Sequence, residues 1–81
     1  MNFSEQELKI IFTSSCVESA ARSVGCNVSD MYARMKKVNL IEEYIWKFYE
    51  QLHSESREHV TEDVLETLKA WENRGDAFQR N

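Results

Sequence analysis

The chain contains no proline and only two glycines, Gly25 and Gly75, in 81 residues. Tight turns between β-strands draw heavily on glycine and proline, so a sheet with many hairpins is disfavoured. Apolar residues make up 42% of the chain and charged residues 30%, which is typical of a folded globular protein. We therefore predict an all-α fold, a single small domain built as a bundle of about four helices.

Capping residues and apolar spacing predict helices over residues 5–24, 30–37, 40–53 and 62–74. Ser4 and Glu7 have the spacing of a capping box at the start of the first helix. Gly25 is expected to end that helix, because glycine readily adopts the left-handed conformation found there. Asn39, followed three residues later by Glu42, is the expected cap of the third helix.

The second and fourth helices have weaker boundary signals. Ser29 and Thr61 are their expected N-terminal caps. The polar stretch 54–60 lacks helical apolar spacing and is interpreted as a loop. Gly75 is expected to end the last helix, so that the domain covers residues 1–75 and residues 76–81 form a frayed tail. The first, third and fourth helices are expected to build the core, with the second as a short corner piece.

The segment Asn39–His53 has the clearest apolar pattern in the chain. At about 100° of rotation per residue, one core-facing stripe collects Leu40, Ile41, Tyr44, Ile45, Phe48 and Leu52. Trp46 falls on the opposite side of the helix, and two interpretations stay open. Its side chain packs under a neighbouring segment of the same chain, or it is an exposed anchor for a partner protein, because tryptophan is enriched among interface hot spots.

The first two helices also carry apolar residues at helical spacing. In the first helix these residues cover a wide arc, which is typical of a helix packed on two sides. They are Leu8, Ile11, Phe12, Cys16, Val17, Ala20, Ala21 and Val24. In the second helix they are Met31, Tyr32 and Met35.

Charge and cysteine content narrow the functional class. Residues 1–37 contain five basic and four acidic side chains, whereas residues 38–81 contain five basic and ten acidic ones. No polybasic tract for nucleic acid or membranes is present, and no long apolar segment or signal peptide is recognised. Cys16 and Cys26 do not have the spacing of a metal site and are expected to be reduced. These features favour a cytoplasmic protein.

The corner around Gly25 has the spacing of a helix-turn-helix motif over residues 16–37. A small residue, Ala21, precedes the glycine, and Met31 follows where the second helix would be seated. A recognition helix would then present Tyr32, Arg34, Lys36 and Lys37 to DNA. A purely structural corner needs the same residues, and the overall acidity argues against DNA, so a DNA-binding regulator is the alternative hypothesis.

His53 and His59 flank the polar stretch, with Glu55, Glu58, Glu62 and Asp63 nearby in sequence. Histidine and carboxylates are the usual components of metal or acid–base sites. The six-residue separation of the histidines matches no helical metal motif, so we expect neither a metal site nor a cofactor. No nucleophile motif or phosphate-binding loop is present, and we expect no enzymatic activity.

Several short motifs resemble a bacterial family known as domain of unknown function 3791. They are Tyr32-x-Arg34-Met35, Leu40 with Glu43-Tyr44-Ile45, Tyr49-Glu50-x-Leu52-His53-Ser54, and Val60-Thr61-Glu62-Asp63-Val64 with Leu68. The resemblance spans about Leu8 to Leu68, and Trp46 and Phe48 depart from the family pattern. It implies a small bacterial protein, of a kind often encoded beside or fused to domains similar to ADP-ribosyltransferase-type toxins. An antitoxin-like binding role is implied, and no catalytic residue is carried over.

The leading hypothesis is a non-enzymatic, all-α interaction module with a protein partner, for which a toxin encoded nearby is a candidate. The expected contact residues are Trp46, Tyr49, His53 and His59. The sequence leaves homo-oligomer formation open.

Overall fold

The computed structural model describes the backbone of residues 3–79 and the side chains of residues 3–74. Within this range every regular element is a helix. The elements are α1 (Glu5–Val24), α2 (Val28–Lys37), the π-helix η1 (Ile41–Trp46), α3 (Tyr49–Leu52) and α4 (Arg57–Gln79). The predicted all-α fold is confirmed, and none of these helices is long and apolar enough to cross a membrane.

Helix α1 has the predicted bounds because local capping interactions define both of its ends. The Ser4 amide donates to Glu7 Oε1 at 2.8 Å, and the Glu7 amide donates to Ser4 Oγ at 3.1 Å. Gly25 follows the helix with φ of 77°, and its amide donates to the Ala21 carbonyl at 2.9 Å. A left-handed glycine that returns a hydrogen bond to the last turn is a common end for a helix.

Helix α2 begins two residues earlier than predicted. Its cap is Asn27, whose Oδ1 accepts a hydrogen bond from the Asp30 amide at 2.8 Å. Both Asn27 and Ser29 are good capping residues. Asn27 comes first in the chain and has the extended backbone of a cap, so the prediction of Ser29 as the cap is wrong, and Ser29 lies inside the helix.

The predicted continuous helix over residues 40–53 is divided into η1 and α3. Asn39 has φ of 62°, and no side-chain hydrogen bond caps η1, so the predicted capping box at this point is wrong. A π-helix forms i→i+5 hydrogen bonds and therefore rotates each side chain by less than an α-helix does. A turn at Lys47–Phe48 then changes the direction of the chain before α3.

This break changes the side-chain phase that the sequence predicted. Leu40, Ile45 and Leu52 are buried as expected. Phe48 was expected in the core, but 41% of its surface is exposed. Trp46 is half-buried and packs against the core, in agreement with the interpretation that it packs against a neighbouring segment of the same chain.

Helix α4 is longer than predicted at both ends. Ser56 precedes its first residue, Arg57, and accepts through Oγ from the His59 amide at 3.2 Å, so the predicted loop over residues 54–60 is shortened. The first turn is exposed apart from Val60, and it therefore carries no apolar periodicity. Thr61 is not a cap, because its hydroxyl donates to the Arg57 carbonyl within the helix.

The predicted end of the last helix at Gly75 is also wrong, since α4 continues to Gln79. Glycine inside a helix costs about 1 kcal/mol relative to alanine and does not forbid the conformation. Of the tail predicted over residues 76–81, the part up to residue 79 is helical, and residues 80–81 lie outside the described residues.

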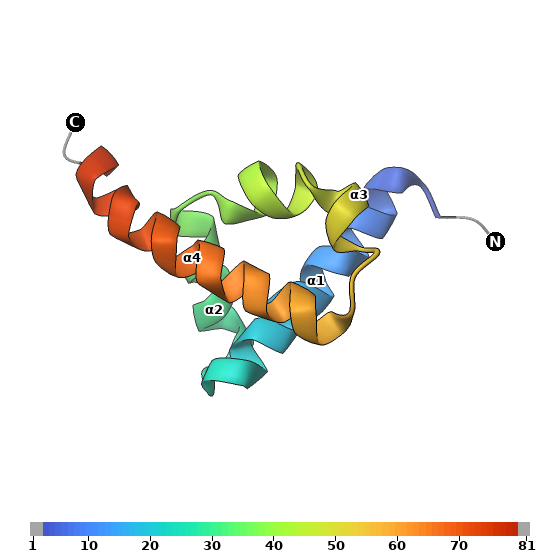
Figure 1. Cartoon of the computed structure of the whole chain (residues 1–81), viewed down its shortest axis with the longest axis horizontal. Coiled ribbons are helices and arrows are strands. Elements are labelled where there is room, and N and C mark those ends of the chain that lie inside the picture. The colour runs from blue at the N-terminus through green and yellow to red at the C-terminus, as the bar shows by residue number, and fades with distance from the viewer. Residues whose placement is uncertain (1–2, 80–81) are drawn as a thin grey trace.

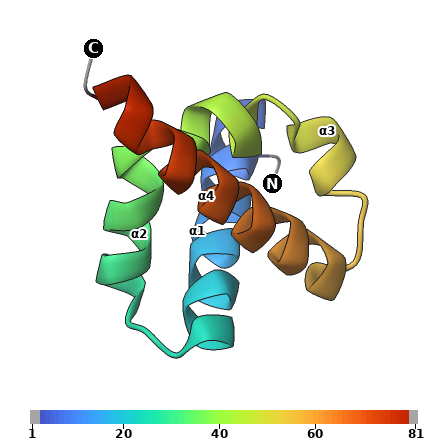
Figure 2. The same cartoon turned by 60° about the vertical axis from the view of Figure 1, so that its left-hand side comes forward.

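The core is centred on α1, which packs against α2, α4 and η1. Figure 2 shows α1 and α2 side by side with α4 crossing them, and Figure 1 shows η1 and α3 along the other side of α4. The buried cluster combines residues from all three partners of α1. Its members are Cys16, Val17, Ala20, Ala21, Met31, Met35, Leu40, Ile45, Val60, Val64 and Leu68.

Two expectations about the core are corrected. Helix α2 is a core element and not only a corner piece, because Met31 and Met35 are fully buried. Three apolar residues of α1 that were expected to pack inward instead reach solvent. They are Leu8, Ile11 and Val24, each at least 41% exposed.

Candidate functional site

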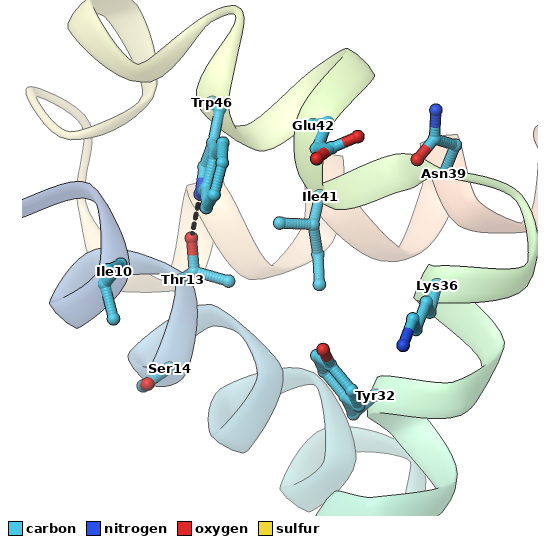
Figure 3. Close-up of a pocket in the computed structure, with 9 residues that line it drawn as sticks. All are labelled: Ile10, Thr13, Ser14, Tyr32, Lys36, Asn39, Ile41, Glu42 and Trp46. Atoms are coloured by element: carbon cyan, nitrogen blue, oxygen red, sulfur yellow. Dashed lines mark hydrogen bonds between the residues drawn. The ribbon is translucent and has the colours of Figure 1, made fainter. Parts of the chain in front are cut away.

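A groove of about 380 Å³ lies between α1, α2 and η1 (Figure 3). We call it the α1–α2–η1 groove. Its apolar lining comes from Ile10, Tyr32, Ile41 and Trp46, and its polar lining from Thr13, Ser14, Lys36, Asn39 and Glu42. Ile41 and Trp46 from η1 and Tyr32 from α2 point toward the same space (Figure 3). The groove therefore combines an apolar interior with charged groups of both signs.

Trp46 is held in place by a hydrogen bond to the neighbouring helix. Its indole Nε1 donates to Thr13 Oγ1 at 2.7 Å, and the Thr13 hydroxyl donates in turn to the Lys9 carbonyl at 2.7 Å. Thr13 is buried, so this pair satisfies two polar groups in an apolar setting. Trp46 therefore packs against its own chain, as the first of the two interpretations states. Its ring also lines the groove.

The groove residues contributed by α1 and α2 include side chains that are more exposed than Trp46. Tyr32 is 45% exposed, and Ile10 is 49% exposed. The Lys36 ammonium lies 5.9 Å from the centre of the Tyr32 ring, which is within cation–π range. A smaller hollow of about 170 Å³ adjoins the groove, sharing Tyr32 and adding Val28. Together these residues place apolar surface along one continuous side of α1 and α2.

The other predicted contact residues lie elsewhere. Tyr49 packs edge-to-face on Phe12, with 5.4 Å between the ring centroids, and stacks on His53, with 4.6 Å between the ring centroids. The Lys9 ammonium is 6.0 Å from the Tyr49 ring. His59 is exposed on α4 and lies near Asp63. The structure thus brings Tyr49 and His53 together, and neither of them, nor His59, lines the groove.

The helix-turn-helix hypothesis meets a specific difficulty at Arg34. Its guanidinium donates two hydrogen bonds of 2.8 Å to the carboxylate of Glu72 on α4. This pairing raises the pKa of Arg34 and lowers the pKa of Glu72. Tyr32 and Lys36 line the groove, and Lys37 is exposed. The strongest phosphate-binding side chain of the set is therefore engaged within the fold.

The cysteines do not form a nucleophilic site. Cys16 is buried in the core, and burial raises the pKa of its thiol to about 11. A thiol with such a pKa is protonated at neutral pH and is a poor nucleophile. Cys26 is half-buried.

Sequence reasoning identified Trp46 but missed most of the groove. The one usable signal was Thr13, a polar residue on the buried side of α1 between apolar positions, which implied a buried hydrogen-bond partner. Ile41 and Glu42 carried no such signal, because their approach to α2 depends on the π-helical path of η1, and Ile10 is one of several apolar residues on α1 with nothing to single it out.

Comparison with known proteins identifies one family. The family model described as "Protein of unknown function (DUF3791)" matches residues 11–71, which is more than half of the chain. The match includes all of α2, η1 and α3 and most of the groove lining. No curated protein and no solved structure matches the chain.

Proposed function

The chain belongs to this family of proteins of unknown function, and we propose that it is a non-enzymatic interaction module that binds a partner protein in the α1–α2–η1 groove. The observation that carries the proposal is the pairing of exposed apolar walls with a fixed interior. Ile10 and Tyr32 face solvent, while Trp46 is held by Thr13. A surface of this kind gains binding energy from apolar burial without having to order its own aromatic anchor.

The dimensions of the groove favour a protein segment over a small molecule. A volume of about 380 Å³ is near the lower end for small-molecule sites. Because about half of the surfaces of Ile10 and Tyr32 is exposed, a ligand confined to the interior would leave the walls in water. A partner helix that inserts one or two apolar side chains would cover the walls as well.

Charge at the rim indicates how such a segment would be oriented. Lys36 makes no ion pair among the residues whose side chains are described, and its neighbour Lys37 is also exposed. On the opposite side of the groove lies Glu42. A partner segment with a carboxylate beside its apolar anchor would meet Lys36, and this would fix its direction along the groove.

The family resemblance supplies the first partner to test, a toxin similar to ADP-ribosyltransferase-type enzymes encoded beside the protein. In this proposal the protein acts as an antitoxin-like module and blocks or stabilises the toxin by occupying one of its surfaces. The adjacent gene product would be co-expressed with the chain, and binding measured by co-purification and calorimetry.

Two adjacent isoleucines in α1 provide a matched pair of variants. Ile10 lines the groove and is 49% exposed, whereas Ile11 is 51% exposed and is not part of the lining. Ile10→Ala should weaken partner binding at least tenfold, and Ile11→Ala should leave it unchanged. If the two variants weaken binding equally, the groove is not the binding site. If no complex forms with the adjacent gene product, the toxin is not the partner.

DNA binding remains the second proposal, favoured by the glycine corner between α1 and α2 and by exposed Lys36 and Lys37 at the end of α2. Replacing both lysines with alanine should abolish a salt-dependent shift of promoter DNA. A wild-type protein that binds no DNA at low salt would exclude this role.

A further inference from the structure

We propose that Glu55, His59 and Asp63 form a binding site for a divalent transition-metal ion at the start of α4. One ligand atom from each residue, a histidine nitrogen or a carboxylate oxygen, lies within 4.8 Å of the other two. The six-residue spacing of the two histidines predicted no metal site, because it matches no helical metal motif. In the structure His59 lies close to two carboxylates, and His53 is not part of this group.

The local fold explains why these three side chains converge. His59 and Asp63 are four residues apart in α4 and therefore lie on the same face of the helix. Their Nε2 and Oδ2 atoms are 3.9 Å apart. Glu55 lies in the turn just before the helix, where its amide donates to the Leu52 carbonyl at 3.1 Å. Ser56, the next residue, lies just before α4 and accepts from the His59 amide through Oγ, which holds Glu55 beside the first turn.

The electrostatics of the cluster favour a cation. Glu55 and Asp63 place two carboxylates close together. Among the residues whose side chains are described, neither carboxylate forms an ion pair with a lysine or arginine. Like charges at short range repel each other, and a bound divalent ion would replace that repulsion with attraction.

The donor set indicates which ions would bind. One imidazole nitrogen and two carboxylate oxygens suit Zn²⁺, Ni²⁺ or Cu²⁺ better than Mg²⁺ or Ca²⁺, which prefer oxygen ligands alone. Ligand bonds of 2.0–2.2 Å place tetrahedral ligands about 3.4 Å apart. The present separations of 3.9 Å and up to 4.8 Å therefore require the side chains to close by about 1 Å. Glu55 and His59 are exposed and free of tight packing, so such rotations are accessible.

A metal ion at this site would connect the turn after α3 to the first two turns of α4. A metal ion that binds the folded state but not the unfolded state stabilises the fold, and the gain rises with the logarithm of the ratio of metal concentration to Kd. Three protein ligands leave coordination positions for water, as in open zinc sites. The expected consequence is a metal-dependent rise in Tm.

The two histidines of the chain allow a controlled test. Calorimetric titration of the untagged protein with zinc sulfate, with magnesium chloride as the comparison ion, should show one equivalent of zinc bound. His59→Ala should weaken zinc binding at least tenfold, and Glu55→Gln and Asp63→Asn should weaken it measurably. His53→Ala, which removes an exposed histidine outside the cluster, should have no effect.

The same variants show which results would overturn the proposal. Circular dichroism verifies that each variant is folded, which is expected because His53 and His59 are both exposed. The absence of saturable zinc binding up to millimolar concentration would overturn the site. Equal losses of zinc affinity in His53→Ala and His59→Ala would also overturn it. Loss of zinc binding in Cys26→Ser would overturn it as well, because that result would assign the metal to the half-buried thiol.

Discussion

Arg34 on α2 and Glu72 on α4 are joined by two parallel hydrogen bonds of 2.8 Å across 38 residues of sequence. Paired geometry of this kind is the strongest form of contact between a guanidinium and a carboxylate. It connects the helix that lines the α1–α2–η1 groove to the helix that crosses the core. The orientation of α2, and with it the groove wall formed by Tyr32, depends in part on this contact.

The ion pair makes stability depend on pH in a defined direction. The hydrogen bond from Arg34 lowers the pKa of Glu72 in the folded state. The stabilisation is therefore fully present above the unfolded pKa of this carboxyl and is lost as pH falls through its folded pKa. Glu72→Gln should reduce the free energy of unfolding at neutral pH by less than about 1 kcal/mol, because both side chains are about one-third exposed. The difference from wild type should shrink toward zero in acid.

Urea denaturation at neutral and acidic pH measures this effect. Glu66→Gln is a suitable control, since Glu66 is exposed on the same helix. A deficit for Glu72→Gln that stays constant down to strongly acidic pH would show that the lost ion pair is not its cause.

The hydrogen bond between Trp46 and Thr13 should contribute measurably to stability. Thr13→Val keeps the shape of the side chain but leaves the indole N–H without its acceptor. An unsatisfied donor in a partly buried site costs about 1–3 kcal/mol. Chemical denaturation should show this loss, and Thr13→Ser, which keeps the hydroxyl, should recover most of it. If Thr13→Val is as stable as wild type, the bond does not hold Trp46 in solution.

The π-helical path of η1 predicts opposite outcomes for two large apolar residues. Ile45 is fully buried, so Ile45→Ala should cost about 2–5 kcal/mol. Phe48 is 41% exposed, so Phe48→Ala should cost about 1 kcal/mol or less. A continuous α-helix would bury both residues and make both substitutions severe. Thermal and urea denaturation of the two variants therefore distinguish the two backbone paths.

The start of α2 can be tested with the two candidate caps. Asn27→Ala should cost about 1 kcal/mol, because it removes the acceptor of the Asp30 amide. Ser29→Ala should change stability by only a few tenths of a kcal/mol, because Ser29 is exposed inside the helix. A larger loss from Ser29→Ala than from Asn27→Ala, measured in the same denaturation assay, would place the helix start two residues later.

Local interactions explain where the sequence analysis was accurate. The bounds of α1 depend on contacts between residues three or four apart, such as Ser4 with Glu7 and Gly25 with Ala21. Such contacts are visible in a sequence because both partners have a known spacing. The absence of proline and scarcity of glycine similarly excluded a turn-rich β fold.

Helix boundaries were predicted wrongly where two capping residues lie close together in the sequence, or where the first turn of a helix is exposed to solvent. Asn27 and Ser29 are both capping residues, and only one can begin the helix. The first turn of α4 faces solvent, so it shows no apolar pattern from which to recognise it. The prediction at Gly75 failed because the helical preference of neighbouring residues can outweigh the modest cost of one glycine.

The sequence by itself determined the helical class, the extent of α1, the glycine corner and membership of an uncharacterised family. Only the tertiary structure decided which side chains meet. The π-helix and the turn after it place Trp46 against Thr13 and expose Phe48, Arg34 on α2 pairs with Glu72 on α4, and the start of α4 brings His59 to Glu55 and Asp63. The physical reason is that these contacts depend on a few tens of degrees of helix rotation and on where each helix begins. Packing between helices sets both quantities, and a periodic pattern along one helix does not contain that information.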